Sequence, residues 1–447
     1  MDSSIVKNTG KQAREFLLET GMHAENVHFD AILEAMKGEM DAGLSGGESS
    51  LAMIPTFIEA EREIPLNKRV LVLDAGGTNF RTALVSFDAD GTPLVENYSK
   101  SPMPGSTGYV KRDEFFDSLA DKAVHLWGSA DSIGFCFSYP TEITPERDGK
   151  LLHFSKEIDA PEVEGEYVGL RLKEALLRAG AQLAQGVPHV VVLNDTVATL
   201  LAAKAAGGRE RYGGYLGFIL GTGLNCAYVE HNSVIGKIDS LPAGRSQIVN
   251  MESGGFDGFP GGRADEELDA STKSPGSYRM EKMVSGAYLG PLAHTLLKSA
   301  GENGLFSPET AERISSLPSV ETAALDRFLR SPMEGTSSGI AAAFSGKDAE
   351  KDRLSAYILL DNIVERAGKL AALNISAAVI HGGSGENPSC PAAVCADGTT
   401  FYKTRRLKFY TEYYLKRELE ERYRHYVHLV ALDNAPLIGA AVAGLTN

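Results

Sequence analysis

Two short glycine- and threonine-rich turns, each lying between two apolar runs, constrain this chain more than any other feature of its sequence. The first turn occupies residues 74–79, between a β-branched run at 70–73 and a second run at 80–87. The second occupies residues 220–225, between apolar runs at 216–220 and 226–229. A strand, a tight turn and a returning strand, found twice, predict a duplicated α/β unit with one turn in each half and a cleft between the halves.

The patterns along the rest of the chain also indicate α/β layers. Residues 29–44 carry apolar side chains at helical spacing, with Asn26 or Asp30 as the candidate cap, and helical patterns also cover 195–206 and 407–426. Strands are predicted at 70–73, 80–87, 133–137, 190–193, 216–220, 226–229, 377–380 and 427–432. Helices interleaved with strands are typical of α/β folds.

Charge and cysteine content exclude several classes of protein. Lys and Arg number 44 against 59 Asp and Glu, which gives a net charge of −15 and an acidic surface that repels nucleic acid and anionic lipid. The four cysteines are too few for a disulfide scaffold and predict reduced thiols. The start of the sequence is polar, and no run approaches the ~18 apolar residues of a membrane span. We therefore expect a cytoplasmic protein with no membrane or nucleic-acid partner.

The first turn has the composition of a phosphate site. Its two glycines allow backbone N–H groups to approach an anion, its polar side chains add donors, and a carboxylate at the strand end could hold Mg²⁺ through water. These candidates are Asp74, Gly76, Gly77, Thr78, Asn79 and Arg81. The alternative is an ordinary hairpin. The second turn repeats the design without charge through Gly221, Thr222 and Gly223, so the two could hold the β- and γ-phosphates of a nucleotide from two sides.

Asp195 lies where α/β folds bind ligands, because it follows the apolar run 190–193 and opens a helical pattern. There it could accept a proton from a hydroxyl group as a general base. The alternative is a helix N-cap, a position that Asp favours. The neighbouring Asn194 and the two phosphate turns favour the catalytic interpretation.

Glu252 and Glu281 are candidates for binding a sugar, because an ionised carboxylate accepts two hydrogen bonds from neighbouring hydroxyl groups. Taken singly, a glutamate is more often a solvated surface residue, which is the alternative for each of them.

Taken together in this order, these motifs resemble the eukaryotic-type hexokinase family of the actin-like ATPase superfamily. The matching segments are residues 73–81, 137–140, 193–196, 221–228, 281–286, 397–403 and 439–441. The resemblance implies an α/β, two-lobed actin-like ATPase fold, a duplicated ribonuclease-H-like unit with a central cleft. It places residues 1–65 and 197–434 in a large lobe, and residues 66–196 and 435–447 in a small lobe.

The resemblance also implies roles for single residues. The hexose would be held by Ser138, Ser155, Lys156, Asn194, Asp195, Asn225, Glu252 and Glu281. ATP would be bound by Asp74, Gly76, Gly77, Thr78, Asn79, Arg81, Gly221, Thr222, Gly223, Gly398 and Thr399. Catalysis would fall to Asp195, Lys156 and Arg81. Mg²⁺ would lie near Asp74 and Asp195.

The implied reaction is transfer of the γ-phosphoryl group of MgATP to the 6-hydroxyl of a hexose, with glucose as the first candidate. The chain departs from the family pattern at 154–158, where the family has Trp-Thr-Lys-Gly-Phe, and at Ser253, where it has Trp. Because of these departures, the sequence does not decide whether the sugar is glucose, mannose, fructose or an amino sugar. A non-sugar ATPase of the same superfamily and a catalytically weak hexose sensor are the alternatives. The sequence leaves oligomeric state, regulation and nucleoside preference open.

Overall fold

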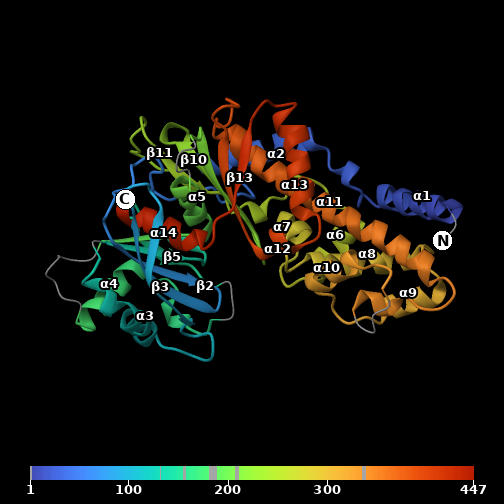
Figure 1. Ribbon diagram of the computed structural model, residues 1–447, viewed down its shortest axis with the longest axis horizontal. Coiled ribbons are helices and arrows are strands. Elements are labelled where there is room, and N and C mark those ends of the chain that lie inside the picture. Colours follow the sequence, from blue (N-terminus) through green and yellow to red (C-terminus); the bar gives the residue numbers. More distant parts are fainter. Residues whose placement is uncertain (1–2, 131, 155–157, 181–188, 207–210, 335–338) are drawn as a thin grey trace.

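Two β-sheets, joined by a pair of crossing helices, form the framework of the molecule (Figure 1). The computed structural model describes residues 3–130, 132–154, 158–180, 189–206, 211–334 and 339–447. The two sheets share one strand order. In each sheet, the first strand of a hairpin pairs antiparallel with the second strand of that hairpin. On its other side it pairs in parallel with a third strand, which pairs in parallel with the strand at the edge. The fold is thus α/β and two-lobed, as predicted.

The first sheet has five strands in the order β4-β3-β2-β5-β8. Their bounds are β2 (Val70–Gly76), β3 (Asn79–Phe87), β4 (Pro93–Pro102), β5 (Ser132–Phe137) and β8 (Val190–Leu193). α3 (Arg112–Trp127) and α4 (Val168–Arg178) supply apolar side chains to the core on one face, next to η2 (Pro161–Val163). A small hairpin of β6 (Thr141–Ile143) and β7 (Gly149–Leu151) follows β5.

The second sheet has six strands in the order β1-β11-β10-β9-β12-β13. Their bounds are β1 (Ile54–Pro55), β9 (Gly214–Leu220), β10 (Leu224–His231), β11 (Ser246–Asn250), β12 (Ala392–Asp397) and β13 (Val427–Val430). Without β1, this order repeats that of the first sheet, which supports a duplicated unit.

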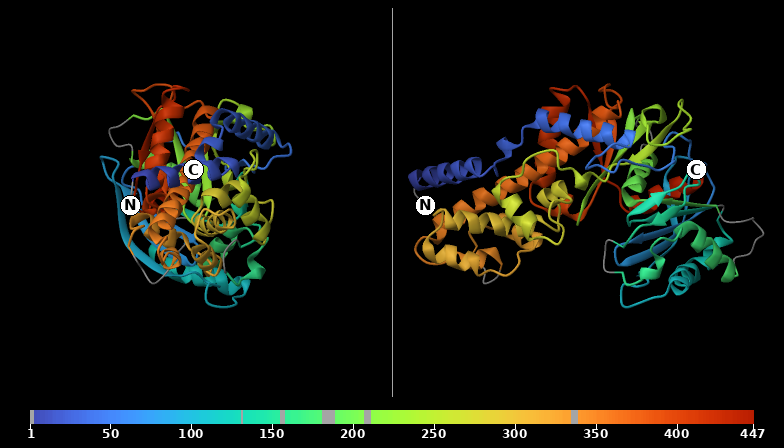
Figure 2. Two further views of the ribbon diagram at one scale, coloured as in Figure 1. Left: turned by 90° about the vertical axis from the view of Figure 1, so that its right-hand side faces the viewer. Right: turned by 180° about the vertical axis from the view of Figure 1, so that it is seen from behind.

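A large helical body lies beside the six-stranded sheet, at the end of the molecule far from the five-stranded sheet (Figure 2). Its longest member is α11 (Ala349–His381), which is buried along most of its length. The other helices are α1 (Ser3–Glu19), α2 (Phe29–Ser45), α6 (Arg263–Ser271), α7 (Arg279–Val284), α8 (Leu289–Glu302), α9 (Pro308–Ser315), α10 (Thr322–Arg330), α12 (Thr399–Lys403) and α13 (Leu407–Tyr414). Short turns are η1 (Ala24–Asn26), η4 (Asn232–Val234), η5 (Ser253–Gly255), η6 (Ile340–Ala343) and the π-helix η7 (Leu415–Glu420).

Two equivalent helices cross between the sheets and exchange partners. α5 (Asp195–Ala206) follows the last strand of the five-stranded sheet but packs on β9 and β12 of the other sheet. α14 (Ala435–Thr446) follows the last strand of the six-stranded sheet but packs on β2 and β5. Gly439 allows this crossing, because a Cβ atom there would lie 1.6 Å from the Ala198 carbonyl oxygen. The predicted lobe boundaries themselves stay a prediction.

Several predicted elements are confirmed, and others are wrong. β8 and α5 have the predicted bounds, and β2, β3, β5, β9 and β10 contain the predicted runs. The predicted strand at 377–380 is wrong: these residues form the end of α11, because a short apolar run fits a fully buried helix as well as a strand. The caps predicted for α2 are also wrong, since His28 occupies the N-cap position. The helix predicted to reach residue 426 ends with η7 at Glu420. No helix in the described part of the chain is long and apolar enough to cross a membrane.

Candidate active site between the two sheets

A cavity of about 480 Å³ lies where the ends of strands from both sheets meet. Phe137 and Asn194 reach it from β5 and from the end of β8 in the five-stranded sheet. Asn250 and Glu252 reach it from the end of β11 in the six-stranded sheet, and Tyr278 closes one side just before α7. The cavity therefore lies in the position where ligands bind to α/β folds, beyond the carboxyl ends of strands.

The start of α5 places Asp195 at this junction. The Asn194 side chain accepts a hydrogen bond from the Thr196 backbone N–H at 2.8 Å, so Asn194 rather than Asp195 supplies the capping bond. Asp195 is the first residue of the helix, where the helix dipole stabilises a negative charge. The Thr196 hydroxyl donates to one Asp195 carboxylate oxygen at 3.3 Å.

The first turn carries a nearly buried ion pair. Asp74 and Arg81 face each other across β2 and β3, and Arg81 Nη1 lies 2.5 Å from Asp74 Oδ2. Burial raises the pKa of Asp74, Arg81 opposes this shift, and the charge of Asp195 adds to it. Asp195 is thus one of the charged groups that act on Asp74.

The backbone of this turn is held from behind. The Tyr139 hydroxyl donates to the Gly77 carbonyl at 2.6 Å, and the Met103 N–H donates to the Thr78 carbonyl at 2.9 Å. Gly77 has a positive φ of 63°, which glycine adopts without strain. The described part of the chain offers no backbone acceptor to the N–H groups of Gly77 and Thr78, so these donors suit an anion.

Ser138 lies beside the same turn. Its N–H donates to the Ala75 carbonyl at 3.1 Å, and a Cβ atom on Gly76 would lie 3.6 Å from its hydroxyl oxygen. Asn79 pairs with Gly76 at the end of the hairpin. All predicted residues of the first turn therefore lie together.

The second turn packs against two other glycine segments. The Gly221 carbonyl accepts from the Gly286 N–H and from the Thr400 hydroxyl, both at 2.8 Å. Gly398 lies directly on this turn, with a φ of 119°, and a Cβ atom there would lie 2.2 Å from the Leu220 carbonyl oxygen. Predicted nucleotide residues from 221–223 and 398–399 thus come together. Sequence reasoning missed Gly286 and Thr400 as members of this cluster.

Glu252 and Glu281 lie close to the second turn. Glu281 Oε2 accepts from the Leu224 N–H at 2.9 Å. Glu252 Oε1 accepts from Asn250 Nδ2 at 2.8 Å and from Asn225 Nδ2 at 3.2 Å. Burial raises the pKa of both carboxyl groups, and the charges of Asp195 and Glu281 raise that of Glu252 further. Neither glutamate is therefore a solvated surface residue.

Asp195 follows β8 of the five-stranded sheet and opens α5, which packs on β9 and β12 of the six-stranded sheet. Its charge raises the pKa of both Asp74 and Glu252. Sequence reasoning missed Asn250, although its position two residues before Glu252 predicts the same face of an extended segment. The predicted Ser155 and Lys156 lie outside the described residues.

The described residues of the candidate active site supply only part of a metal coordination shell. Within the described ranges, no group of three His, Cys, Asp or Glu side chains could hold a metal ion. Mg²⁺ keeps several waters and binds through one or two carboxylates plus substrate phosphates, so Asp74 and Asp195 are the carboxylates of this site that would hold it.

Two sheets of one strand order, a glycine turn in each, and a cavity at the strand ends lined by Asn194 and Glu252 define a two-lobed phosphotransferase of the actin-like ATPase fold. Comparison with known proteins makes this more specific. Two family models, both described as hexokinase, match residues 14–205 and 215–446. The chain belongs to the hexokinase family, and it is a sugar kinase.

Relatives support this assignment. The chain is 30% identical over 366 residues to Hexokinase-1 of Schizosaccharomyces pombe, covering 78% of this chain and 74% of that protein. It is 34% identical over 301 residues to Hexokinase-2 of Oryza sativa subsp. japonica, covering 63% of this chain and 59% of that protein. The match to human Hexokinase-3 is 32% identical over 321 residues, covering 68% of this chain but only 33% of the human protein.

Solved structures share the fold. A Schistosoma mansoni hexokinase complexed with glucose superposes with a TM-score of 0.76 and 22% identity, covering 98% of this chain and 99% of the other. A second hexokinase crystal structure gives a TM-score of 0.77 at 22% identity, with the same coverage. At this identity the likeness establishes the fold.

Proposed function

We propose that this protein transfers the γ-phosphoryl group of MgATP to the 6-hydroxyl group of a hexose, with glucose as the first candidate. The observation that carries this proposal is the position of Asp195. It opens α5 at the junction of the two sheets, and its charge acts on the first turn and on the Glu252 network together. A group in that position can contact a sugar and a triphosphate at once.

The sugar would bind among Ser138, Asn194, Asn225, Glu252 and Glu281. The two glutamates supply acceptors for hydroxyl groups, and Asn225 and Asn250 hold Glu252 through its Oε1 atom. Because Oε1 already accepts two hydrogen bonds, Glu252 Oε2 is the oxygen with more capacity for a sugar hydroxyl. Ser155 and Lys156 belong to the same proposed set by resemblance.

ATP would bind between the two turns. The N–H groups of Gly77 and Thr78, the side chains of Thr78 and Asn79, and Arg81 supply donors on one side. Gly221, Thr222 and Gly223 supply backbone groups on the other side, and Gly398 and Thr399 would contact the adenosine. Arg81 uses Nη1 for Asp74, and its guanidinium has further N–H donors for a phosphate.

Mg²⁺, which would arrive with ATP, would be held near Asp74 and Asp195 and would offset phosphate charge. Phosphoryl transfer asks little covalent work of a protein, so positioning and charge dominate. Asp195 would accept the proton of the 6-hydroxyl group as that oxygen attacks. Closure of the lobes around the cavity would exclude water, which otherwise competes for the phosphoryl group.

The partly buried Glu252 and Glu281 favour a sugar substrate over the purely mechanical output of a non-sugar ATPase. A coupled ADP-release assay with MgATP tests this across glucose, mannose, fructose, glucosamine and a sample without sugar. We expect ADP release that depends on hexose. Equal ADP release without sugar would support the ATPase alternative, and hexose binding without ADP release would support the sensor alternative.

A further inference from the structure

Glu252 has a left-handed backbone conformation, with φ 55° and ψ 47°, at the point where β11 ends and η5 begins. This conformation is strained for a residue with a side chain, so it persists only where the surrounding structure enforces it. Backbone bonds hold the chain on both sides: the Met251 N–H donates to the Cys226 carbonyl at 3.0 Å, and the Gly255 N–H donates to the Glu252 carbonyl at 3.1 Å. Whatever fixes η5 therefore also fixes the direction of the Glu252 carboxylate.

Ser253, the first residue of η5, is completely buried and forms hydrogen bonds through both its N–H and its hydroxyl group. The N–H donates to Asn225 Oδ1 at 3.3 Å, and the hydroxyl accepts from Asn374 Nδ2 at 2.8 Å. Asn225 in turn donates to Glu252 Oε1 at 3.2 Å. Ser253, which stands where the family pattern has Trp, thus links the Glu252 network to a side chain of α11.

Asn374 lies inside α11, and none of its surface is exposed. Its neighbours one turn before and after it along the helix are Leu370, Ala377 and Ala378, which are also completely buried. Among the described residues, Asn374 Oδ1 has no hydrogen-bond partner, and a buried polar atom without a partner destabilises a protein. A leucine at this position would avoid that cost. The presence of the amide therefore points to a role for the bond from its Nδ2 to Ser253.

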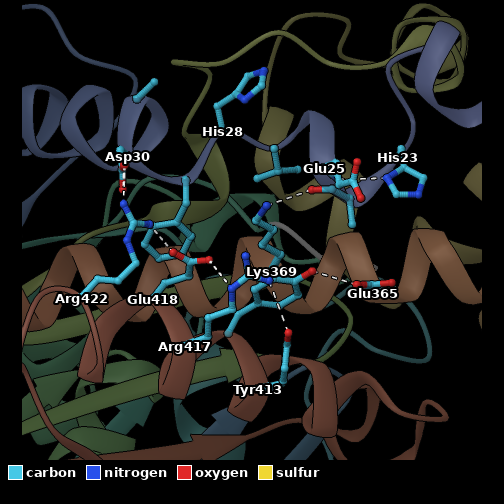
Figure 3. A pocket seen from close by; sticks show the side chains of 15 residues that line it. His23, Glu25, His28, Asp30, Glu365, Lys369, Tyr413, Arg417, Glu418 and Arg422 are labelled. Atoms are coloured by element: carbon cyan, nitrogen blue, oxygen red, sulfur yellow. Dashed lines mark hydrogen bonds and ion pairs between the residues drawn. The ribbon is translucent and has the colours of Figure 1, made fainter.

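Two other buried polar side chains of α11 hold a different segment. Asn362 Oδ1 accepts from the Ala24 N–H at 3.2 Å, and Lys369 Nζ donates to the Ala24 carbonyl at 3.0 Å. Lys369 lies in a pocket of about 610 Å³ that is enclosed by the segment from His23 to Ala31, by α11, and by the end of α13 with η7 (Figure 3). This pocket shares no lining residue with the candidate active site. Asn362 and Lys369 thus secure the α1–α2 connection, whereas Asn374 bonds to the segment that carries Glu252.

We infer that Asn374 is a positioning residue of the candidate active site: through Ser253 it holds η5, and so keeps Glu252 in the conformation that presents its carboxylate to the sugar. The inference rests on the proposed function, in which Glu252 binds the hexose. The same segment also packs on the second glutamate, because a Cβ atom on Gly254 would lie 3.1 Å from Glu281 Cβ. Loss of the bond should weaken sugar binding in the ground state and the transition state alike, which raises KM and leaves kcat unchanged.

Asn374→Leu tests the inference, because it removes the amide at nearly constant volume. Steady-state kinetics of the full chain with MgATP should show a KM for glucose that is raised about fivefold, the equivalent of one hydrogen bond, with kcat and the KM for ATP unchanged. Asn362→Leu is the matched control, since it removes a buried amide from the same helix and should leave the KM for glucose unchanged. Equal rises in KM in the two variants would overturn the inference.

A double variant separates positioning from stability. Ser253→Ala combined with Asn374→Leu removes both polar partners, so it should restore most of the free energy of unfolding that Asn374→Leu loses. The KM for glucose should stay raised, because no side-chain hydrogen bond then ties η5 to α11. Recovery of the wild-type KM together with stability would contradict the inference. The double variant also supplies the KM measurement if Asn374→Leu alone does not fold.

Urea denaturation tests the same contact apart from the proposed function. If the wild type releases no ADP with any hexose, the proposed function fails, and the coupling between Asn374 and Glu252 is measured instead. Glu252→Gln should change the free energy of unfolding by different amounts in the wild type and in the Asn374→Leu background, because the bond to Ser253 helps to set the environment of Glu252. Equal changes in the two backgrounds would overturn the inference.

Discussion

The hairpins β2–β3 and β9–β10 occupy the same place in two sheets of the same strand order, yet they differ in charge. The first carries the Asp74–Arg81 ion pair, and Tyr139 and Met103 hold the backbone of its turn. The second has no charged residue in its turn and is held by Gly286, Gly398 and Thr400 from other segments. The repeated backbone thus provides two similar turns. Side chains give the first turn its charged residues, whereas the second turn is uncharged and packs closely against other segments.

The helices that follow the last strand of each half show the same difference. α5 opens with Asp195 at the candidate active site. α14 opens with Ala435 and is buried along almost its whole length. The duplicated framework therefore provides two equivalent hairpins and two equivalent helices. Catalysis would need the hairpin and the helix that carry charged residues.

The largest expected effect is a difference in kcat between a substitution at the start of α5 and one just before α14. Asp195→Ala should lower kcat by about 10²–10⁴-fold, because it removes the proposed general base, while hexose binding stays measurable. Asp433→Ala is the matched control, since Asp433 is an exposed aspartate just before α14. Steady-state kinetics would check both variants. A kcat near that of the wild type in Asp195→Ala would refute the assignment of the base.

The next effect compares the packing of the two turns. Gly398→Ala should lower the free energy of unfolding by about 3 kcal/mol, because its Cβ atom would meet the backbone of the second turn. Gly77→Ala, in the first turn, should cost only about 1 kcal/mol for its positive φ. Urea denaturation measures both. An equal loss in free energy of unfolding for the two variants would mean that the close packing of Gly398 on the second turn adds nothing to stability.

The third effect concerns the charge that distinguishes the first hairpin. Arg81→Gln should lower the free energy of unfolding by about 2 kcal/mol, because it leaves the Asp74 carboxylate buried without its cation. Arg69→Gln provides the comparison on the same sheet. Its ion pair with Glu96 is half exposed, so its loss should cost no more than about 0.5 kcal/mol. If urea denaturation shows the same loss in free energy of unfolding for both variants, the Asp74–Arg81 pair stabilises the protein no more than the exposed pair does.

The smallest effect is a gain in stability. Burial raises the pKa of Glu252, so the folded protein holds the proton of this group more tightly than the unfolded chain does. The ionised group is therefore destabilising at neutral pH, and this cost falls as pH drops through the raised folded-state pKa.

Glu252→Gln should accordingly raise the free energy of unfolding by about 0.5–1 kcal/mol at pH 7 and weaken hexose binding. The gain should disappear toward the pH at which Glu252 is protonated in the folded protein. Thermal or urea unfolding at several pH values would check this. A variant less stable than the wild type at pH 7 would show that the Asn225 and Asn250 hydrogen bonds outweigh the burial of the charge.

Local patterns predicted the segments in which neighbouring residues decide the structure. β8 and α5 have their predicted bounds, because a β-branched run followed by Asn194 and Asp195 encodes both a strand end and a helix start. The two hairpins were predicted for a similar reason, since their glycines and strand formers lie next to each other. Motif order predicted the family, but the separate roles of the site residues stay predictions.

Tertiary structure alone decided the rest. Residues 377–380 could be helix or strand until α11 proved to be buried on nearly all sides, where periodicity gives no signal. The exchange of α5 and α14 between the sheets depends on Gly439 meeting Ala198, a contact between residues far apart in the chain. The pocket around Lys369 likewise joins three distant segments. Sequence encodes local preference directly, whereas burial, partner choice and the balance of buried charge arise only when distant segments meet.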